Sequence, residues 1–256
     1  DWDDFETSWN FTVTPLLAGG GQRPLAEAFG EYNQRWIRVS LRQQALEESN
    51  NVVIAKLYGL DHEVATTVSL DRVTLTRNAE FRYSGKTATE HSTLFRQDAA
   101  KDLVSYAVGC MFGRYSLDEP GLILADQGAT VHDYLVKVPS PMFAPDKDNV
   151  IPIVAGDWFE DDIVARFRTF LRVAFGEQHF EENLRFVTES LGVKDIREYF
   201  VRTGTRAASS KFYDDHIQRY KKRPIYWLFS SPKGSFNALI YMHRYTPSTV
   251  STVLNE

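Results

Sequence analysis

After an aromatic lead-in, the first long segment of the chain shows helical periodicity. Apolar residues recur at three- and four-residue steps from Leu25 to Val39, directly after Pro24, and this spacing predicts an amphipathic helix. The polar run "EESNN" (residues 47–51) predicts a break, with a second helix that stops at Gly59. We expect a helical hairpin packed against the rest of the domain. A partner-binding coiled coil is the alternative, which the shortness of the repeat disfavours.

The next segments combine a short strand with an apolar helix. "RVTLTR" (residues 72–77) predicts a strand, and the run from about Thr93 to Phe112 predicts a buried helix. The apolar part of this helix is shorter than the roughly 18 residues that span a membrane. Cys110, the single cysteine, lies inside it, so a small buried hydrophobe is favoured over a reactive thiol, and no internal disulfide is possible.

A proline-rich stretch precedes the C-terminal part of the chain. Residues 129–157 predict a long irregular crossing. Two helices are then predicted to end at Gly176 and Gly192. A third helix is predicted at "VKDIREYFVR" (residues 193–202), and a further helix runs up to Pro224.

The aromatic stretch "KRPIYWLFSSPKGSFNALIYMHRY" (residues 222–245) allows two interpretations. Exposed aromatics beside Lys and Arg form stacking platforms for bases, whereas two apolar strands joined by "SSPKGS" predict an antiparallel hairpin. Both faces of the predicted strands, residues 225–230 and 236–243, are largely apolar. We therefore favour a sheet element buried on two sides, with its aromatics as scaffold.

Together these elements predict an α+β fold, predominantly helical, with a small mixed or antiparallel sheet that includes the C-terminal hairpin near residues 225–243. The 256 residues divide into 1–128 (helical hairpin, central helix and a small β segment), the crossing loop 129–157, and 158–256. One composite domain is the alternative, and both fit the usual size of domains.

Charge is distributed unevenly along the chain. The overall net charge of −5 argues against a general nucleic-acid-binding protein, because phosphate binding depends on clustered Lys and Arg. Residues 146–195 hold eleven acidic and six basic residues, while residues 197–223 hold eight basic and three acidic ones. The C-terminal region therefore contains one acidic and one basic stretch.

Common catalytic motifs are absent from the sequence. It has no GxGxxG after a strand, no GxxxxGK[ST], no HExxH and no GxSxG. The acidic runs at residues 160–162 and 214–216 resemble metal-binding clusters, but acids in a first helical turn complement the helix dipole, and adjacent helix positions point apart. We expect no complete active site, no metal and no cofactor in this chain.

Several long motifs resemble one family. They are "ETSWNFTVTPLL" (6–17), "LYGLDHEV" (57–64), "LVSYAVGCMFGRYSLDEPGLILADQG" (103–128), "GDWFEDDIVARFRTFLRVAFGEQHFEENLRF" (156–186) and "KRPIYWLFSSPKGSFNALIYMHRYTP" (222–247). These stretches look like the PglX family, the adenine-specific DNA methyltransferases of the BREX (bacteriophage exclusion) and phage-growth-limitation systems. They are specific, and they extend over nearly the whole chain.

The resemblance implies a longer protein. PglX-like proteins carry an S-adenosylmethionine-dependent methyltransferase domain with an [ND]PP[YF] motif, which this sequence lacks. The resemblance therefore implies that this chain is the C-terminal portion, with the upstream methyltransferase domain and other BREX proteins as partners. No signal peptide opens the sequence, so we expect a cytoplasmic location. The abrupt, Met-less start suggests a fragment.

A target-recognition portion needs contacts with double-stranded DNA, since phosphate contacts set the register and groove contacts read the sequence. Loops at residues 82–86 and 127–147 carry donors suited to base edges. The candidate phosphate contacts come from the basic stretch and the ends of the hairpin: Arg202, Arg206, Lys211, Arg219, Lys221, Lys222, Arg223, Lys233 and Arg244.

Two other functions compete with DNA recognition. The chain is alternatively a protein-interaction module that docks the methyltransferase onto other defence components through the acidic helices of residues 146–195. A nuclease is disfavoured, because "PDKDN" (residues 145–149) is too short for a PD-(D/E)xK site.

Overall fold

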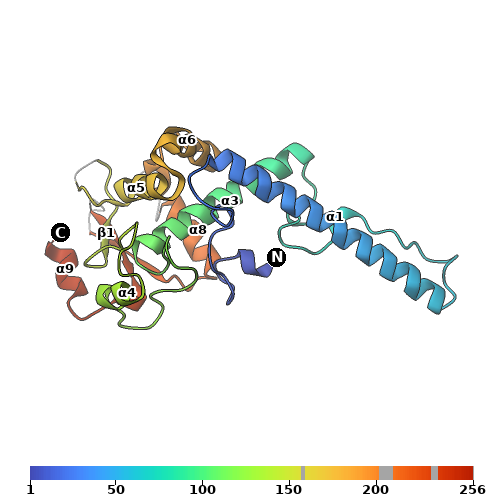
Figure 1. Cartoon of the computed structure of the whole chain (residues 1–256), viewed down its shortest axis with the longest axis horizontal. Coiled ribbons are helices and arrows are strands. Elements are labelled where there is room, and N and C mark those ends of the chain that lie inside the picture. Colours follow the sequence, from blue (N-terminus) through green and yellow to red (C-terminus); the bar gives the residue numbers. More distant parts are fainter. Residues whose placement is uncertain (157–158, 202–209, 232–235, 256) are drawn as a thin grey trace.

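The computed structural model describes residues 1–156, 159–201, 210–231 and 236–255, and it confirms a predominantly helical α+β fold (Figure 1). The long helices are α1 (Leu25–Leu57), α3 (Ala88–Met111), α5 (Ile163–Phe175), α6 (Phe180–Leu191) and α8 (Lys211–Arg219). The short ones are α2 (Ala79–Arg82), α4 (Val131–Lys137), α7 (Arg197–Phe200) and α9 (Thr249–Asn255), with 3-10 turns at Trp2–Asp4, Leu70–Arg72, Glu177–His179 and Met242–Arg244.

α1 is one continuous helix, so the predicted break at residues 47–51 and the helical hairpin are wrong. Asparagine lowers helix propensity only modestly, and this run holds no proline or glycine. The following segment returns along the helix and bonds to it. The Gln44 side chain donates to the Val68 carbonyl oxygen (2.7 Å), and Glu48 accepts from the Val68 N–H (3.0 Å). Figure 1 shows α1 projecting from the body as an arm.

The predicted strand at residues 72–77 is also wrong. This stretch holds the end of a 3-10 turn and an irregular segment in which Val73 is buried. Asn78 organises it, because its side-chain amide donates to the carbonyl oxygens of Leu70 (2.7 Å) and Val73 (2.9 Å). Side-chain bonds to the backbone compete with strand pairing in this way.

α3 runs through the centre of the body. Thr87 and Glu90 form a capping box at its start, so the helix begins five residues before the predicted Thr93. From Leu103 to Met111 every residue is buried, which requires neighbours on all sides of the helix.

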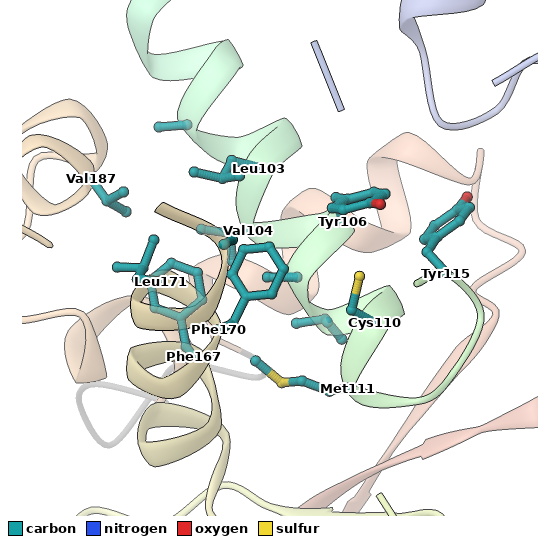
Figure 2. Close-up of a cluster of buried hydrophobic side chains, with 14 of the residues drawn as sticks. Leu103, Val104, Tyr106, Cys110, Met111, Tyr115, Phe167, Phe170, Leu171 and Val187 are labelled. Carbon is teal, nitrogen blue, oxygen red and sulfur yellow. The ribbon is translucent and has the colours of Figure 1, made fainter. Parts of the chain in front are cut away.

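The neighbours of α3 include α5. Figure 2 shows Leu103 and Val104 of α3 beside Phe170 and Leu171 of α5. Cys110 is buried in the same helix, and burial raises the pKa of its thiol well above the usual value. The predicted packing role of this cysteine is therefore confirmed.

α5 and α6 end at the two predicted glycines. Gly176 and Gly192 have φ values of 91° and 64°, a region that favours glycine at helix ends. At the other end of α5, the Asp162 carboxylate accepts from the Ala165 N–H (2.7 Å). Both helices pack against α3, and this layer covers one side of the central helix (Figure 1).

The sheet has three antiparallel strands, β1 (Val150–Pro152), β2 (Tyr226–Ser230) and β3 (Asn237–Tyr241), in the order β1-β3-β2. The predicted hairpin is confirmed, with Leu228 opposite Leu239. β1 lies in the proline-rich stretch, where no regular structure was predicted, and so does α4. α9 covers the outer face of the sheet, where its Val253 joins a cluster of buried side chains from β1 and β3.

The two strands of the hairpin differ in burial. β3 is the central strand, and its Ala238, Leu239 and Tyr241 are fully buried. β2 is an edge strand, and its Trp227 is 53% exposed. The expectation of burial on two sides therefore holds for β3 and is wrong for β2.

The main cluster of buried side chains draws on residues from Phe11 to Tyr241, and so on all three segments into which the sequence was divided. In the described part of the chain, no helix combines the length and apolar character needed to cross a membrane.

His216 of α8 joins this helix to the edge of the sheet. Its Nε2 accepts hydrogen bonds from the N–H groups of Ile225 and Tyr226, both at 3.2 Å. Burial, followed by the positive charges of Arg219 and Arg114, lowers the pKa of His216 to about 3. The imidazole is therefore neutral, with its hydrogen on Nδ1.

We expect the contribution of His216 to stability to be lost as the pH falls below about 6.5, the usual pKa of an unfolded histidine. Between this value and about 3, the unfolded chain binds a proton that the folded chain does not, which costs about 1.4 kcal/mol per pH unit. Urea denaturation between pH 7 and pH 4 measures this slope in the wild type and in His216→Gln. The variant should show the smaller slope, and equal slopes would contradict the assignment.

Candidate nucleic-acid interface

Three consecutive cations follow α8. The helix ends at Arg219, and Lys221, Lys222 and Arg223 are all exposed after it. The N–H of Lys222 donates to the Ile217 carbonyl oxygen at 2.8 Å, which closes the turn. None of the three side chains forms an ion pair with a described acidic residue. We call residues 221–223 the basic turn.

The two lysines of the basic turn have left-handed backbone conformations, with φ of 50° at Lys221 and 65° at Lys222. Glycine is favoured in such a helix cap, because a Cβ atom costs roughly 1–2 kcal/mol there. Cations near a helix C-terminus interact favourably with its dipole, which is a purely structural reason for lysine. Strained residues also mark functional sites, and the exposed, unpaired charges favour this second interpretation.

Arg219, a predicted phosphate contact, lies instead in a partly buried ionic network. Its Nη1 donates to Asp102 Oδ1 (2.6 Å), and its Nε is 3.9 Å from Glu6 Oε2. Arg77 bonds the other oxygen of Asp102 at 2.9 Å. Burial alone would raise the pKa of Asp102, but Arg219 and Arg77 hold it below its usual range. The charge of Arg219 is therefore already neutralised within the chain.

Arg244, another predicted contact, is 5% exposed. Its guanidinium donates to the carbonyl oxygens of Phe112 (3.3 Å) and Lys147 (3.2 Å), and burial lowers its pKa. The residue joins the end of α3 to the stretch before β1, so we do not include it in the interface.

The remaining predicted contacts are Lys211, Arg202, Arg206 and Lys233. Lys211 is exposed at the first position of α8, at the opposite end from the basic turn. Arg202, Arg206 and Lys233 lie outside the described residues, and their roles stay predictions. The basic turn is thus the part of the predicted set that is both exposed and contiguous.

The loops predicted to read bases are held by local bonds. In the first, Arg82 pairs with Asp98 (2.6 Å) and Lys86 with Glu90 (3.3 Å). In the second, residues 127–147, α4 forms the middle. We keep neither loop in the candidate interface.

A second basic surface, not predicted from the sequence, lies on the first half of α1. Arg35, Arg38 and Arg42 are exposed, and none forms an ion pair with a described acidic residue. Their three- and four-residue spacing places them on one side of the helix. The spacing is visible in the sequence, but the prediction followed only the apolar stripe of this helix. We call these residues the α1 ridge.

A hollow of 280 Å³ adjoins the basic turn. Tyr220, which directly precedes this turn, forms part of its wall together with Arg114 and Tyr115. Trp9 also lines the hollow and is 96% exposed. The Tyr220 hydroxyl donates to Glu6 Oε1 at 2.8 Å. This hydrogen bond joins the wall of the hollow to the ionic network of Arg219.

Two curated proteins match the chain over its whole length. Adenine-specific methyltransferase BrxX of Escherichia coli O9:H4 (strain HS) is 37% identical over 264 residues, which cover 100% of this chain and 22% of that protein. Adenine-specific methyltransferase PglX of Lacticaseibacillus casei (strain Zhang) is 34% identical over 266 residues, covering 99% and 20%. The chain is similar over its whole length to one region of these PglX-like proteins. It spans about a fifth of the length of these curated relatives, and no family model matches it.

In this PglX-like chain, the acidic runs considered as metal sites make structural contacts. Asp162 pairs with Arg197 at 2.9 Å as well as capping α5. Asp215 pairs with Lys101 at 2.8 Å and accepts from the Tyr199 hydroxyl at 2.7 Å. Within the described ranges, no group of three or more His, Cys, Asp or Glu side chains is placed to hold a metal ion.

Glycine at Lys222 should not destabilise the PglX-like chain. Relief of roughly 1–2 kcal/mol of left-handed strain exceeds the entropic cost of roughly 0.4–1 kcal/mol for an extra glycine, so the free energy of unfolding should rise by about 0.5–1 kcal/mol. Arg185→Gly, at an exposed position in the middle of α6, is the matched control and should lose about 1 kcal/mol. Urea denaturation compares them, and equal losses would show that the turn is not strained.

Proposed function

We propose that this chain is the DNA target-recognition portion of an S-adenosylmethionine-dependent adenine-N6 DNA methyltransferase of a BREX-type phage-defence system, acting in the cytoplasm. The names of the two relatives support the reaction. The chain has no [ND]PP[YF] motif, so the cofactor and the chemistry are assigned to the remainder of a longer polypeptide. This portion then supplies contacts with the duplex.

Such a portion has a physical task. Methylation of adenine requires the base to leave the stack, which costs a few kcal/mol of unstacking and unpairing. Phosphate contacts fix the enzyme on the duplex while this happens. The main support for the proposal is the basic turn, which holds three exposed and unpaired cations in a strained backbone.

The α1 ridge offers a second set of phosphate contacts. Arg35 and Arg42 are seven residues apart, or about 10 Å along a helix. This length corresponds to about three nucleotides of one DNA strand at about 3.4 Å each. A protruding helix with arginines at this spacing suits the backbone of one strand.

The alternative role places a docking face on the acidic helices of residues 146–195. Four of the eleven acidic residues in this region are paired with arginines of the same chain. The pairs are Asp162–Arg197, Glu177–Arg172, Glu189–Arg96 and Asp195–Arg168. The region as a whole keeps a net negative charge, which disfavours contact with DNA phosphates, so the proposed DNA contacts are assigned to the basic turn and to the α1 ridge.

Charge reversal in the basic turn tests the proposal in the full-length protein. Lys221→Glu/Lys222→Glu should weaken binding to a duplex that the wild type methylates. Losing two phosphate contacts should also reduce the slope of log affinity against log salt by about 1.8, at about 0.9 per contact.

The matched control is Arg185→Glu/Lys194→Glu, which changes the net charge equally at two exposed residues on and after α6. This control should bind DNA nearly as the wild type does. A wild-type slope in the Lys221→Glu/Lys222→Glu variant, or equal losses in both variants, would remove the basic turn from the interface.

A further inference from the structure

Trp9 is almost fully exposed, but the backbone around it is fixed. The Ser8 hydroxyl donates to Asp3 Oδ1 (3.0 Å) and accepts from the Asn10 N–H (3.2 Å). Phe11, two residues after Trp9, is buried in the main core. An anchored loop therefore presents the indole ring at the rim of the hollow, next to Leu122, which is 49% exposed.

The wall of the hollow holds one cation, Arg114, and one carboxylate, Glu6, whose Oε1 accepts from the Tyr220 hydroxyl. Arg114 Nε donates to the Tyr115 hydroxyl (3.2 Å), and its Nη1 donates to the Tyr241 hydroxyl (3.0 Å). Burial raises the pKa of both phenols, so these partners stay neutral. Arg114 forms no ion pair with a described acidic residue, and its Nη2 makes no hydrogen bond to one. This nitrogen is available to a ligand.

The residue types match one class of ligand. Aromatic rings beside cations bind unstacked nucleic-acid bases, since every base has a face that stacks. Arginine donates in the plane of a base edge or to a phosphate. The basic turn begins at the residue after Tyr220, so phosphates held there would lie beside the mouth of the hollow.

We propose that the hollow holds an unpaired DNA base, with Trp9 stacked on the base and Arg114 donating to its acceptor atoms or to the adjoining phosphate. This inference rests on the proposed function of the chain. When an adenine is extruded for methylation, its thymine partner is left unpaired. The adenine is bound where the chemistry occurs, outside this chain, so the orphaned thymine is the base available to Trp9.

The test compares two duplexes bound by the full-length protein. The duplexes are identical except at one position. In the first duplex a thymine pairs with adenine, and in the second the same thymine faces an abasic site. The thymine of the second duplex is therefore already unpaired, and no adenine has to be extruded. Trp9→Ala should weaken binding to the abasic duplex about 5- to 150-fold, the range for loss of one stacked base. Trp9→Phe should retain most of the affinity, because it keeps a ring.

Two controls separate this inference from the proposed function. Trp227→Ala removes another exposed tryptophan and should bind as the wild type does. The salt dependence of binding should be unchanged in Trp9→Ala, because no cation is removed, whereas it falls when Lys221 and Lys222 are reversed. A 5-iodouracil in place of the unpaired thymine should crosslink to Trp9 or Tyr220 on irradiation.

The outcomes are distinct. If the wild type binds both duplexes but Trp9→Ala binds the abasic one equally tightly, the inference is overturned and the proposed function stands. If the wild type binds neither duplex, the proposed function fails as well. If Trp9→Ala lowers the melting temperature of the full-length protein and the crosslink maps elsewhere, Trp9 is covered by another part of the polypeptide and the base site is overturned.

Discussion

Asp102 lies between two guanidinium groups in a partly buried ionic network, and the candidate interface depends on this arrangement. Arg77 and Arg219 each bond one of its oxygens, while Glu6 accepts from Ser105 and from Tyr220 nearby. The network joins the N-terminal segment, α3 and α8. Removing Asp102 would leave the fully buried Arg77 guanidinium without its ion-pair partner, and leaving a charge buried in this way typically costs about 3–5 kcal/mol. The basic turn and the hollow are both attached to this network through Tyr220.

Two groups of basic residues in the chain lie in different environments. Arg77 and Arg244, which are buried, and Arg219, which is partly buried, bond carboxylates or carbonyl oxygens of the same chain, a task suited to the planar guanidinium. The basic turn and the α1 ridge leave their charges exposed. A chain with an overall charge of −5 can therefore still present local positive surfaces, since phosphate contacts depend on the nearby charges rather than on the sum.

The sequence predicted the elements that local signals determine. Local signals were sufficient to predict three features. The apolar run predicted α3, the glycines at 176 and 192 predicted the ends of α5 and α6, and the turn residues predicted the hairpin. The continuity of α1 follows from a run at 47–51 without proline or glycine, and the loss of the predicted strand at 72–77 follows from side-chain bonds to the backbone. β1 was missed because it pairs with a strand almost 90 residues later. Among the candidate contacts, Arg219 and Lys221 are two residues apart. Only the fold shows that Arg219 is held in an ion pair with Asp102, whereas Lys221 is exposed.

An exchange of recognition portions tests the central claim most directly. Residues 1–256 would replace the matching region of the Escherichia coli relative, which is 37% identical, and the methylated adenines in cellular DNA would be sequenced. The account predicts that the chimera methylates the sequence recognised by the protein from which residues 1–256 come. An active chimera that still methylates the Escherichia coli target would contradict the assignment of target recognition to this chain.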